Sequence, residues 1–329
     1  MSVLSTSLRR VTKPLAISLL ANSVALHAKL RIISAAKSLT ILCLHRVAEP
    51  SNSGYGALSP ELFDELLGWL KPRFNIITFA ELGQQDADPR PPLTLSFDDG
   101  YSDFYEIAMP ILGRHGLKAN QNVIPGCIES GLPPINVMVQ DFLMSAPEKL
   151  LSEIKFPGHP AGFSQLDRAR LALRMSATLK AKPMVEQRQI LADLTPLFDR
   201  FDDFRTTPMM TRAQVAEIAG VHEIGAHSWE HASMSVESND YVVEDARRCR
   251  EYLANLGTTY PFVYAFPNGM LRKEQVDAVR AAGFDHVLCV GENFSRPENW
   301  LHNRFTFYGD TIAETRFRAL GSLRYPPKP

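Results

Sequence analysis

The sequence predicts an α/β protein with a core of parallel strands, and three observations support this. Short apolar runs alternate with helical patterns along most of the chain, and the clearest run, 93–97, leads directly into the carboxylates Asp98 and Asp99. Gly100 then allows a sharp turn into a helical pattern that starts at Ser102. Repeated strand–helix units favour right-handed crossovers, so we expect the carboxyl-end loops of all strands to share one face.

Length and composition are consistent with this class. A chain of 329 residues can form two domains or one large α/β barrel with insertions. The 35 basic and 36 acidic residues balance, so charge gives no reason to expect nucleic acid as a partner. The four cysteines, Cys43, Cys127, Cys249 and Cys289, form no C-x-x-C pair. We interpret them as small buried apolar residues rather than as a disulfide framework or a zinc clip.

Residues 1–38 are interpreted as an N-terminal helical segment. Arg9, Arg10 and Lys13 precede an uncharged run, 14–28, which is shorter than the roughly 20 residues that a membrane-spanning helix needs. A basic start and an apolar middle also fit a signal peptide, but polar residues dilute the run and leucines and alanines recur with helical spacing. We expect a retained amphipathic helix, a cytoplasmic chain and peripheral membrane contact through this helix, with export as the alternative.

The remaining elements follow in order. Each expected strand is a short apolar run, and most expected helices begin at a capping Ser, Thr or Asn and end at Gly. Besides the run at 93–97, we expect strands at 40–44, 75–79, 119–124, 222–226, 262–266, 286–290 and 304–307. We expect helices at 60–70, 102–115, 212–218, 240–256, 273–282 and 311–320.

Between about 131 and 211 the strand pattern stops and helical periodicity replaces it. Prolines and glycines interrupt this stretch near 157–162 and again at Pro183. We interpret it as a helical insertion in a barrel that covers 39–320 and is followed by a tail at 321–329. Its charged residues are expected to form a solvated face, with capping of the substrate as the alternative.

A second polar cluster follows a strand farther along the chain. His227 and His231 are four residues apart, a spacing that lets two imidazoles bind one metal ion. Each pattern has an ordinary alternative, because Asp-Gly is a common turn and paired histidines are often solvated or buried. Together, one carboxylate and two imidazoles would leave coordination positions open, as a catalytic metal site does.

Four segments resemble motifs of the polysaccharide deacetylases, the NodB-type carbohydrate esterases. SFDDGYSD at 96–103 is similar to the first motif of that family, usually TFDDG, and HSWEH at 227–231 is similar to the second. AFPNG at 265–269 resembles a third motif, and ILCLHRV at 41–47 resembles the opening strand of many members. The resemblance spans about 40 to 310. It implies a distorted (β/α)7-8 barrel and a metal-dependent hydrolase.

The resemblance also implies roles for individual residues. Asp99, His227 and His231 would hold a divalent metal, with zinc expected first and nickel, cobalt, iron or manganese left open. Asp98 would act as the general base. The backbone N–H of Asn268 is the candidate oxyanion donor. The other residues assigned to the substrate or the oxyanion are Tyr101, Phe266, Pro267 and Arg304.

The general acid is less well indicated. The last family motif, Leu-x-His, is out of register here, because Leu301 is followed directly by His302. His302 is the candidate acid, with a surface histidine as the alternative. His45, after the opening strand, either lines the cleft or is structural. The arginine of the third motif is missing, which leaves the orientation of Asp98 unexplained.

We therefore expect an enzyme that hydrolyses the N-acetyl, or another small acyl, group of an amino sugar in a glycan or glycoconjugate. One alternative is a hydrolase of cyclic imides or non-sugar amides with the same fold. Another is a non-catalytic relative that binds glycans. The sequence does not indicate an oligomeric state.

Overall fold

The computed structural model describes residues 21–49, 56–83, 88–154, 165–258 and 261–326. Residues 14–20 of the run 14–28, on which the N-terminal prediction rests, lie outside these residues. Among the described residues, every helix is too short or too polar to cross a bilayer. The strands are β1 (Thr40–Leu44), β2 (Asn75–Ile76), β3 (Pro92–Asp99), β4 (Asn120–Val123), β5 (Glu223–Ala226), β6 (Val263–Ala265), β7 (His286–Val290) and β8 (Leu301–Thr306).

Parallel strands close into a barrel, as expected. Seven of them, β1 and β3 to β8, form the ring, and β1 closes it by pairing with both β3 and β8. The short β2 pairs only with the start of β3 and lies outside the ring. All pairings between named strands are parallel, so the carboxyl ends of the seven strands meet at one rim.

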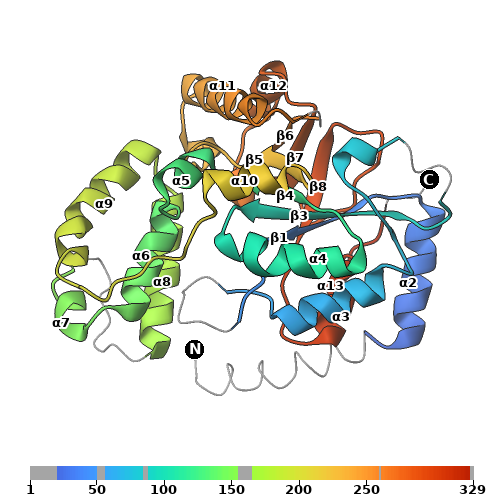
Figure 1. Cartoon of the computed structure of the whole chain (residues 1–329), viewed down its shortest axis with the longest axis horizontal. Coiled ribbons are helices and arrows are strands. Elements are labelled where there is room, and N and C mark those ends of the chain that lie inside the picture. Colours follow the sequence, from blue (N-terminus) through green and yellow to red (C-terminus); the bar gives the residue numbers. More distant parts are fainter. Residues whose placement is uncertain (1–20, 50–55, 84–87, 155–164, 259–260, 327–329) are drawn as a thin grey trace.

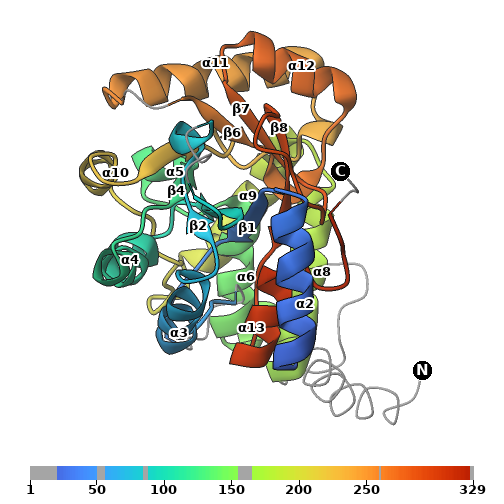
Figure 2. The same ribbon diagram turned by 90° about the vertical axis from the view of Figure 1, so that its right-hand side faces the viewer.

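Helices cover the barrel from several sides (Figure 1). In the views of Figures 1 and 2, α11 and α12 lie on one side of the sheet and α3, α4 and α13 on another. The helices that connect the strands are α3 (Pro60–Leu70), α4 (Met109–His115), α5 (Pro125–Ser130), α10 (Arg212–Ile218), α11 (Asn239–Asn255) and α12 (Lys273–Ala281), and α13 (Ile312–Ala319) follows β8.

Several helix starts agree with the predicted caps. The side chain of Ser59 accepts a hydrogen bond at the start of α3, and the side chain of Thr211 does so at α10. The helix predicted from Ser102 is real but contains a π-helical turn, Phe104–Ala108, before α4. Pro110 in the first turn of α4 has no N–H to continue the regular ladder, and Met109 N–H reaches back to Phe104 O instead.

One helix, α2 (Ser23–Ala35), lies within the predicted N-terminal helical segment 1–38. The side chain of Asn22 caps its start. The helix packs on the C-terminal part of the chain (Figure 2), where the Lys29 ammonium donates to Ser322 O and Leu26 and Ile33 are buried.

The stretch between β4 and α10 is helical, as its periodicity predicts. It contains α6 (Ile135–Ser145), α7 (Glu148–Leu151), α8 (Gln165–Lys180) and α9 (Met184–Phe198), which form a lobe beside the barrel (Figure 1). This lobe has an apolar core of its own, built around Phe142 and distinct from the core of the barrel. The barrel and the lobe therefore each bury their own apolar surface.

A 3₁₀ turn, Phe79–Glu81, closes the amino end of the barrel. Its Phe79 and Ala80 N–H groups donate to the buried carboxylate of Glu223, at the start of β5. The Phe79 ring packs 5.3 Å from the rings of both His286 and His302. His302 is therefore buried near this end, two residues into β8, and its Nε2 lies 3.1 Å from His286 Nδ1.

We expect Gly225→Ala to destabilise the barrel by about 1–3 kcal/mol, because overpacking a filled core forces backbone shifts. A Cβ at Gly225 would lie 2.2 Å from Asn122 Oδ1 and 3.0 Å from Val263 O. Gly113→Ala in α4 is the control, since its Cβ meets nothing within 4 Å, and it should stabilise by roughly 0.5–1 kcal/mol. Urea unfolding followed by circular dichroism measures both. Equal effects of the two variants would contradict the packing argument.

His302 should also make the fold sensitive to acid. Burial lowers the pKa of His302 to about 3, from 6.5 for an exposed ring, and the charge of His286 adds to this. The contribution of the neutral ring to the free energy of unfolding is fully present above pH 6.5. It is lost as the pH falls from 6.5 toward 3, by about 1.4 kcal/mol per pH unit. His302→Gln should flatten the stability curve in this window in urea titrations. An unchanged slope would contradict the assignment.

Candidate metal and catalytic site

Asp98 and Asp99 are the last two residues of β3, and both are only 2% exposed. Asp99 has a φ of 77° and Gly100 a φ of 88°, so the chain turns sharply where the strand ends. A non-glycine residue in this conformation is strained and persists only where its surroundings hold it. The two adjacent carboxylates enter different surroundings, since Asp98 pairs with Arg304 and Asp99 lies against His227 and His231.

The three predicted metal ligands converge. Asp99 Oδ1 lies 3.5 Å from His227 Nε2 and 3.5 Å from His231 Nε2. The candidate ligand atoms of the three residues all lie within 4.8 Å of one another. Atoms bound about 2 Å from one ion at tetrahedral angles lie roughly 3.3 Å apart. The spacing of the trio therefore fits one divalent metal.

Polar atoms in this cluster also fit a cation. Asp99 Oδ1 is buried and has no hydrogen-bond partner within the described residues. Such an oxygen is costly to bury unless a cation or a donor reaches it. Burial, followed by the charges of His227 and Lys180, holds the pKa of His231 well below its ordinary value. The ring is thereby kept neutral, as a metal ligand must be.

A backbone carbonyl group fixes the orientation of the His227 ring through the nitrogen that faces away from Asp99. Its Nδ1 lies 2.8 Å from Ala265 O, at the end of β6, so Nε2 faces Asp99. A backbone carbonyl on the far nitrogen is a common way to orient a metal-binding imidazole. Ala265, the first residue of the third motif, therefore orients the first histidine of the second motif.

Asp245 of α11 holds the loop between the two histidines, a role that the sequence analysis did not identify. Its Oδ2 accepts from Ser228 Oγ and from Trp229 N–H, both at 2.8 Å, and its Oδ1 accepts from Tyr264 Oη at 2.7 Å. Ser228 and His231 have φ values of 62° and 63°. Burial raises the pKa of Asp245, and these hydrogen bonds oppose that rise. The interactions secure a strained loop.

Asp98 is held by groups inside the barrel. Its Oδ1 accepts from Arg304 Nη1 at 2.7 Å and from Asn122 Nδ2 at 2.8 Å. Its Oδ2 lies 3.8 Å from His227 Nε2. Burial acts to raise the pKa of Asp98, but the charges of Arg304 and His227 outweigh it and hold the pKa well below its usual range. The carboxylate therefore stays ionised beside the metal ligands.

This arrangement corrects the prediction for Arg304. We expected it among the substrate or oxyanion residues, but its side chain is completely buried and faces Asp98 from within the barrel. It supplies the orientation of Asp98 that the missing third-motif arginine left unexplained. The sequence placed Arg304 on the last expected strand, two residues after His302. It did not show how deep in the barrel the Arg304 side chain lies.

His302 does not reach the site, which corrects its assignment as the candidate general acid. It lies near the amino end of β8, against Phe79, whereas Asp98 and Asp99 lie at the carboxyl end of β3. Its surface alternative is also wrong, because the side chain is completely buried.

His45 does lie at the site. A ring nitrogen of His45, Cys43 Sγ and an oxygen of Asp98 all lie within 4.8 Å of one another. His45 also lines a cavity of about 380 Å³ between the ends of β1 and β8, together with Thr306 and Tyr308. Burial lowers the pKa of His45, while the charges of Asp99 and Asp98 oppose this. Of the two sequence-based interpretations, the structure supports the cleft position.

The trio of Cys43, His45 and Asp98 is less suited to a second metal. Asp98 is already paired with the guanidinium of Arg304, whose positive charge would repel another cation. Burial raises the pKa of Cys43 well above its ordinary value, which disfavours the thiolate that metals bind.

The other predicted site residues mainly support the rim. Tyr101 and Phe266 are 1% and 0% exposed, and the guanidinium of Arg46 lies 5.4 Å from the centre of the Tyr101 ring. The two side chains are thus packed and do not form an open wall for substrate. Pro267 is also buried, and Asn268 has a φ of 58° with its Nδ2 donating to Ser233 Oγ at 3.0 Å. The role of the Asn268 N–H remains a prediction.

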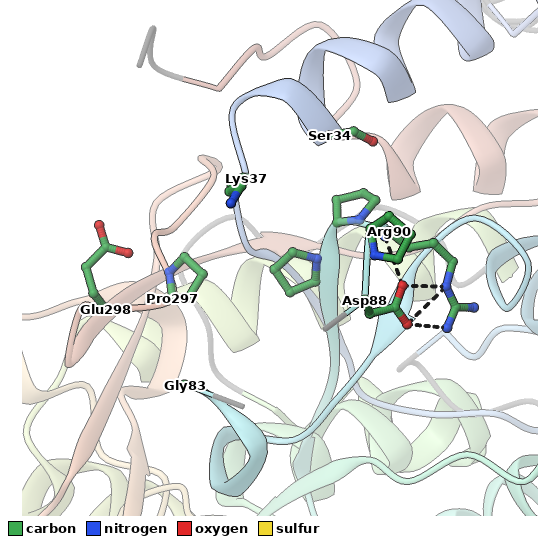
Figure 3. A pocket seen from close by; sticks show the side chains of 10 residues that line it. Ser34, Lys37, Gly83, Asp88, Arg90, Pro297 and Glu298 are labelled. Carbon is green, nitrogen blue, oxygen red and sulfur yellow. Dashed lines mark hydrogen bonds and ion pairs between the residues drawn. The ribbon is translucent and has the colours of Figure 1, made fainter. Parts of the chain in front are cut away.

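A cavity of about 420 Å³ lies elsewhere, beside the start of β3 (Figure 3). Its lining includes Lys37, Glu298 and the ion pair between Asp88 and Arg90. It is near the amino end of β3, and none of the predicted catalytic residues lines it. We therefore place the chemistry at the opposite rim.

Comparison with protein families gives a match to part of the chain. Residues 201–287 match the family model described as "Polysaccharide deacetylase", a segment that contains His227 and His231 and follows Asp98 and Asp99. A comparison with curated proteins finds no significant match.

Solved structures share the fold at low sequence identity. The Streptococcus pyogenes deacetylase PplD, in complex with acetate, has a TM-score of 0.57 at 17% identity, over 86% of this chain and 98% of that one. IcaB from Ammonifex degensii has a TM-score of 0.54 at 16% identity, over 86% and 97%. A de-N-acetylase from Aggregatibacter actinomycetemcomitans has a TM-score of 0.53 at 14% identity, over 84% and 99%. The chain is therefore similar to the polysaccharide deacetylases in two respects, its segment 201–287 and its fold.

Proposed function

We propose that this chain is a metal-dependent deacetylase that hydrolyses the N-acetyl, or another small acyl, group of an amino sugar in a glycan or glycoconjugate. The observation that carries the proposal is the convergence of Asp99, His227 and His231 beside an ionised Asp98. The names of the solved relatives, a deacetylase and a de-N-acetylase among them, support the same reaction class.

Asp99, His227 and His231 would hold the metal. Two imidazoles and a carboxylate suit zinc first, and nickel, cobalt, iron or manganese in the same donor set. When bound, the ion would lower the pKa of a water and polarise the acyl carbonyl.

Asp98 would act as the general base, taking a proton from the attacking water. Its Oδ1 accepts from the strong donors Arg304 and Asn122, whereas Oδ2, on the side of His227, accepts from the weak S–H donor of Cys43 at 3.4 Å. Oδ2 is therefore the atom that would take the proton. Arg304 is a positioning residue, because it touches the base and is buried away from the cleft. Adjacent carboxylates can thus take different roles, since one faces the metal ligands and the other is paired with a guanidinium.

His45 would act as the general acid that protonates the departing amine. It is close to Asp98 and borders the cavity at the rim, whereas His302 is buried near the other end of the barrel. An amine leaves an amide readily only when it is protonated, so hydrolysis needs such a group. The N–H of Asn268 remains our candidate for the developing oxyanion.

Asp98→Asn should retain one bound metal per chain and lose turnover by roughly 10³-fold, because general base catalysis typically contributes 10²–10⁴-fold. Asp99→Asn should lose the metal itself. Metal content by elemental analysis and acetate release measure the two effects. Suitable substrates are chitin oligomers, lipid-linked amino sugars and sugar nucleotides.

His302→Gln is the matched control, since it replaces a buried histidine outside the site and should retain both metal and turnover. If Asp98→Asn were as active as the native chain, Asp98 would not be the base. If no acyl sugar is hydrolysed but glycans bind, the chain is a binding protein. If only cyclic imides or non-sugar amides are hydrolysed, the chain is a hydrolase of those compounds and not of amino sugars.

His45→Gln should slow amide hydrolysis by roughly 10²-fold and leave hydrolysis of 4-nitrophenyl acetate nearly unchanged. The reason is that 4-nitrophenolate leaves without protonation, whereas an amine does not. Parallel assays on the two substrates with the same enzyme preparation measure the difference. An equal loss on both would assign His45 a structural role.

A further inference from the structure

The end of α8 returns to the catalytic rim. Helices α6 and α8 run antiparallel, because Asn136 Nδ2 donates to Ser176 Oγ at 3.3 Å and Arg168 Nη1 donates to Ala146 O at 2.6 Å. Lys180, the last residue of α8, therefore lies toward the start of α6. That start follows closely on α5, which begins just after β4 at the rim.

Contacts on both sides of the metal-binding loop fix this end of the lobe. Gly126 N–H, in α5, donates to Trp229 O at 2.8 Å. After α8, Met184 N–H donates to Glu237 Oε1 at 2.6 Å, and Arg188 forms an ion pair with Glu230, the neighbour of His231. The turn 181–183 is therefore held against the loop that carries both histidines.

Lys180 stands out among the cations of this region. Lys182 pairs with Glu186 at 2.6 Å and Arg188 pairs with Glu230, whereas the Lys180 ammonium has neither a hydrogen bond nor an ion pair within the described residues. Its side chain is only partly exposed. Burial lowers the pKa of Lys180, and the charge of Asp99 partly opposes this. Its charge thus reaches the ligands Asp99 and His231 without a close partner.

An unpaired ammonium beside a metal site is unfavourable for the protein alone. Partial burial removes water from the charge, and the metal expected at Asp99 would repel it. The position of the ammonium becomes favourable when an anion lies between it and the metal, because hydrogen bonds between oppositely charged groups are stronger than those between neutral groups.

We propose that Lys180 forms a subsite for an oxyanion on the substrate, a phosphate or a carboxylate carried by the acylated sugar or by its neighbour. This rests on the proposed function and narrows its substrate class to anionic glycans or glycoconjugates. The helical insertion then contributes a specificity residue to a site whose chemistry comes from the barrel.

Lys180→Gln should separate charged from neutral substrates. The substrates are N,N′,N″-triacetylchitotriose, N-acetylglucosamine 1-phosphate and a disaccharide of N-acetylglucosamine with glucuronic acid. The native enzyme should prefer one of the two charged sugars. The variant should lose about tenfold in kcat/KM on that sugar, mainly through KM, and change less than about twofold on the neutral one. The sugar that responds distinguishes phosphate from carboxylate.

Lys182→Gln is the matched control, because it removes a charge from the same turn that is already paired with Glu186. It should leave the preference intact. An equal loss on neutral and charged sugars in Lys180→Gln, or a native enzyme without any preference for charge, would overturn the subsite.

Failure of the proposed function is detected separately. If the metal-loaded native chain hydrolyses none of the three sugars, their binding to Asp98→Asn and to the double variant with Lys180→Gln is measured by calorimetry. A charged sugar that binds tighter than chitotriose only when Lys180 is present supports the subsite without turnover. Equal affinities for all three sugars exclude it.

Discussion

The buried ion pair between Arg304 and Asp98 is the interaction on which the site depends. Arg304 has no exposed surface, and its only carboxylate partner within the described residues is Asp98, at 2.7 Å. Burying such a pair costs free energy unless neighbouring polar groups complete its hydrogen bonds. Ser96 Oγ accepts from Arg304 Nη1 and from Asn122 Nδ2, and donates to Asn120 Oδ1. The barrel interior is therefore polar beneath the rim, although Arg304 Nε and Nη2 have no hydrogen-bond partner within the described residues. The guanidinium keeps the Asp98 carboxylate ionised and in one orientation.

The same closure of the barrel separates two adjacent carboxylates. Arg304 approaches Asp98 from β8, and the imidazoles approach Asp99 from the loop after β5. The ring makes this possible, because β1 pairs with both β3 and β8 and so places Arg304 near the end of β3. Asp245 completes the arrangement from outside the ring, because it secures the loop in which Ser228 and His231 adopt left-handed backbone conformations. The candidate metal ligands and the candidate base therefore have separate structural supports.

The sequence predicted what depends on local pattern. Strand ends next to Asp98 and His227 followed from apolar runs and turns, and the carboxyl-end rule brought these residues to one rim. Prediction from the sequence failed where a role depended on how far along a strand, from the amino end to the carboxyl end, a side chain lies. His302 and Arg304 are two apart on β8 and both are buried, but one packs near the amino end and the other meets Asp98. The register that separates them arises from pairing with β7 and β1, which no local signal contains. Asp245 was missed because nothing in a helix sequence marks a carboxylate that supports a distant loop.

The insertion shows how the chemistry and the choice of substrate can be separated. Its helices bury an apolar core around Phe142 that is separate from the main core of the barrel. One end of the lobe faces the site. Met184 and Arg188 hold this end, and the Lys180 ammonium on it has no ion-pair partner in the described part of the chain. In the proposed subsite, a charge from this lobe would select among substrates without entering the network of Arg304, Asn122 and Asp98. The proposal thus assigns the type of reaction to the barrel and the preference for charged substrates to the lobe.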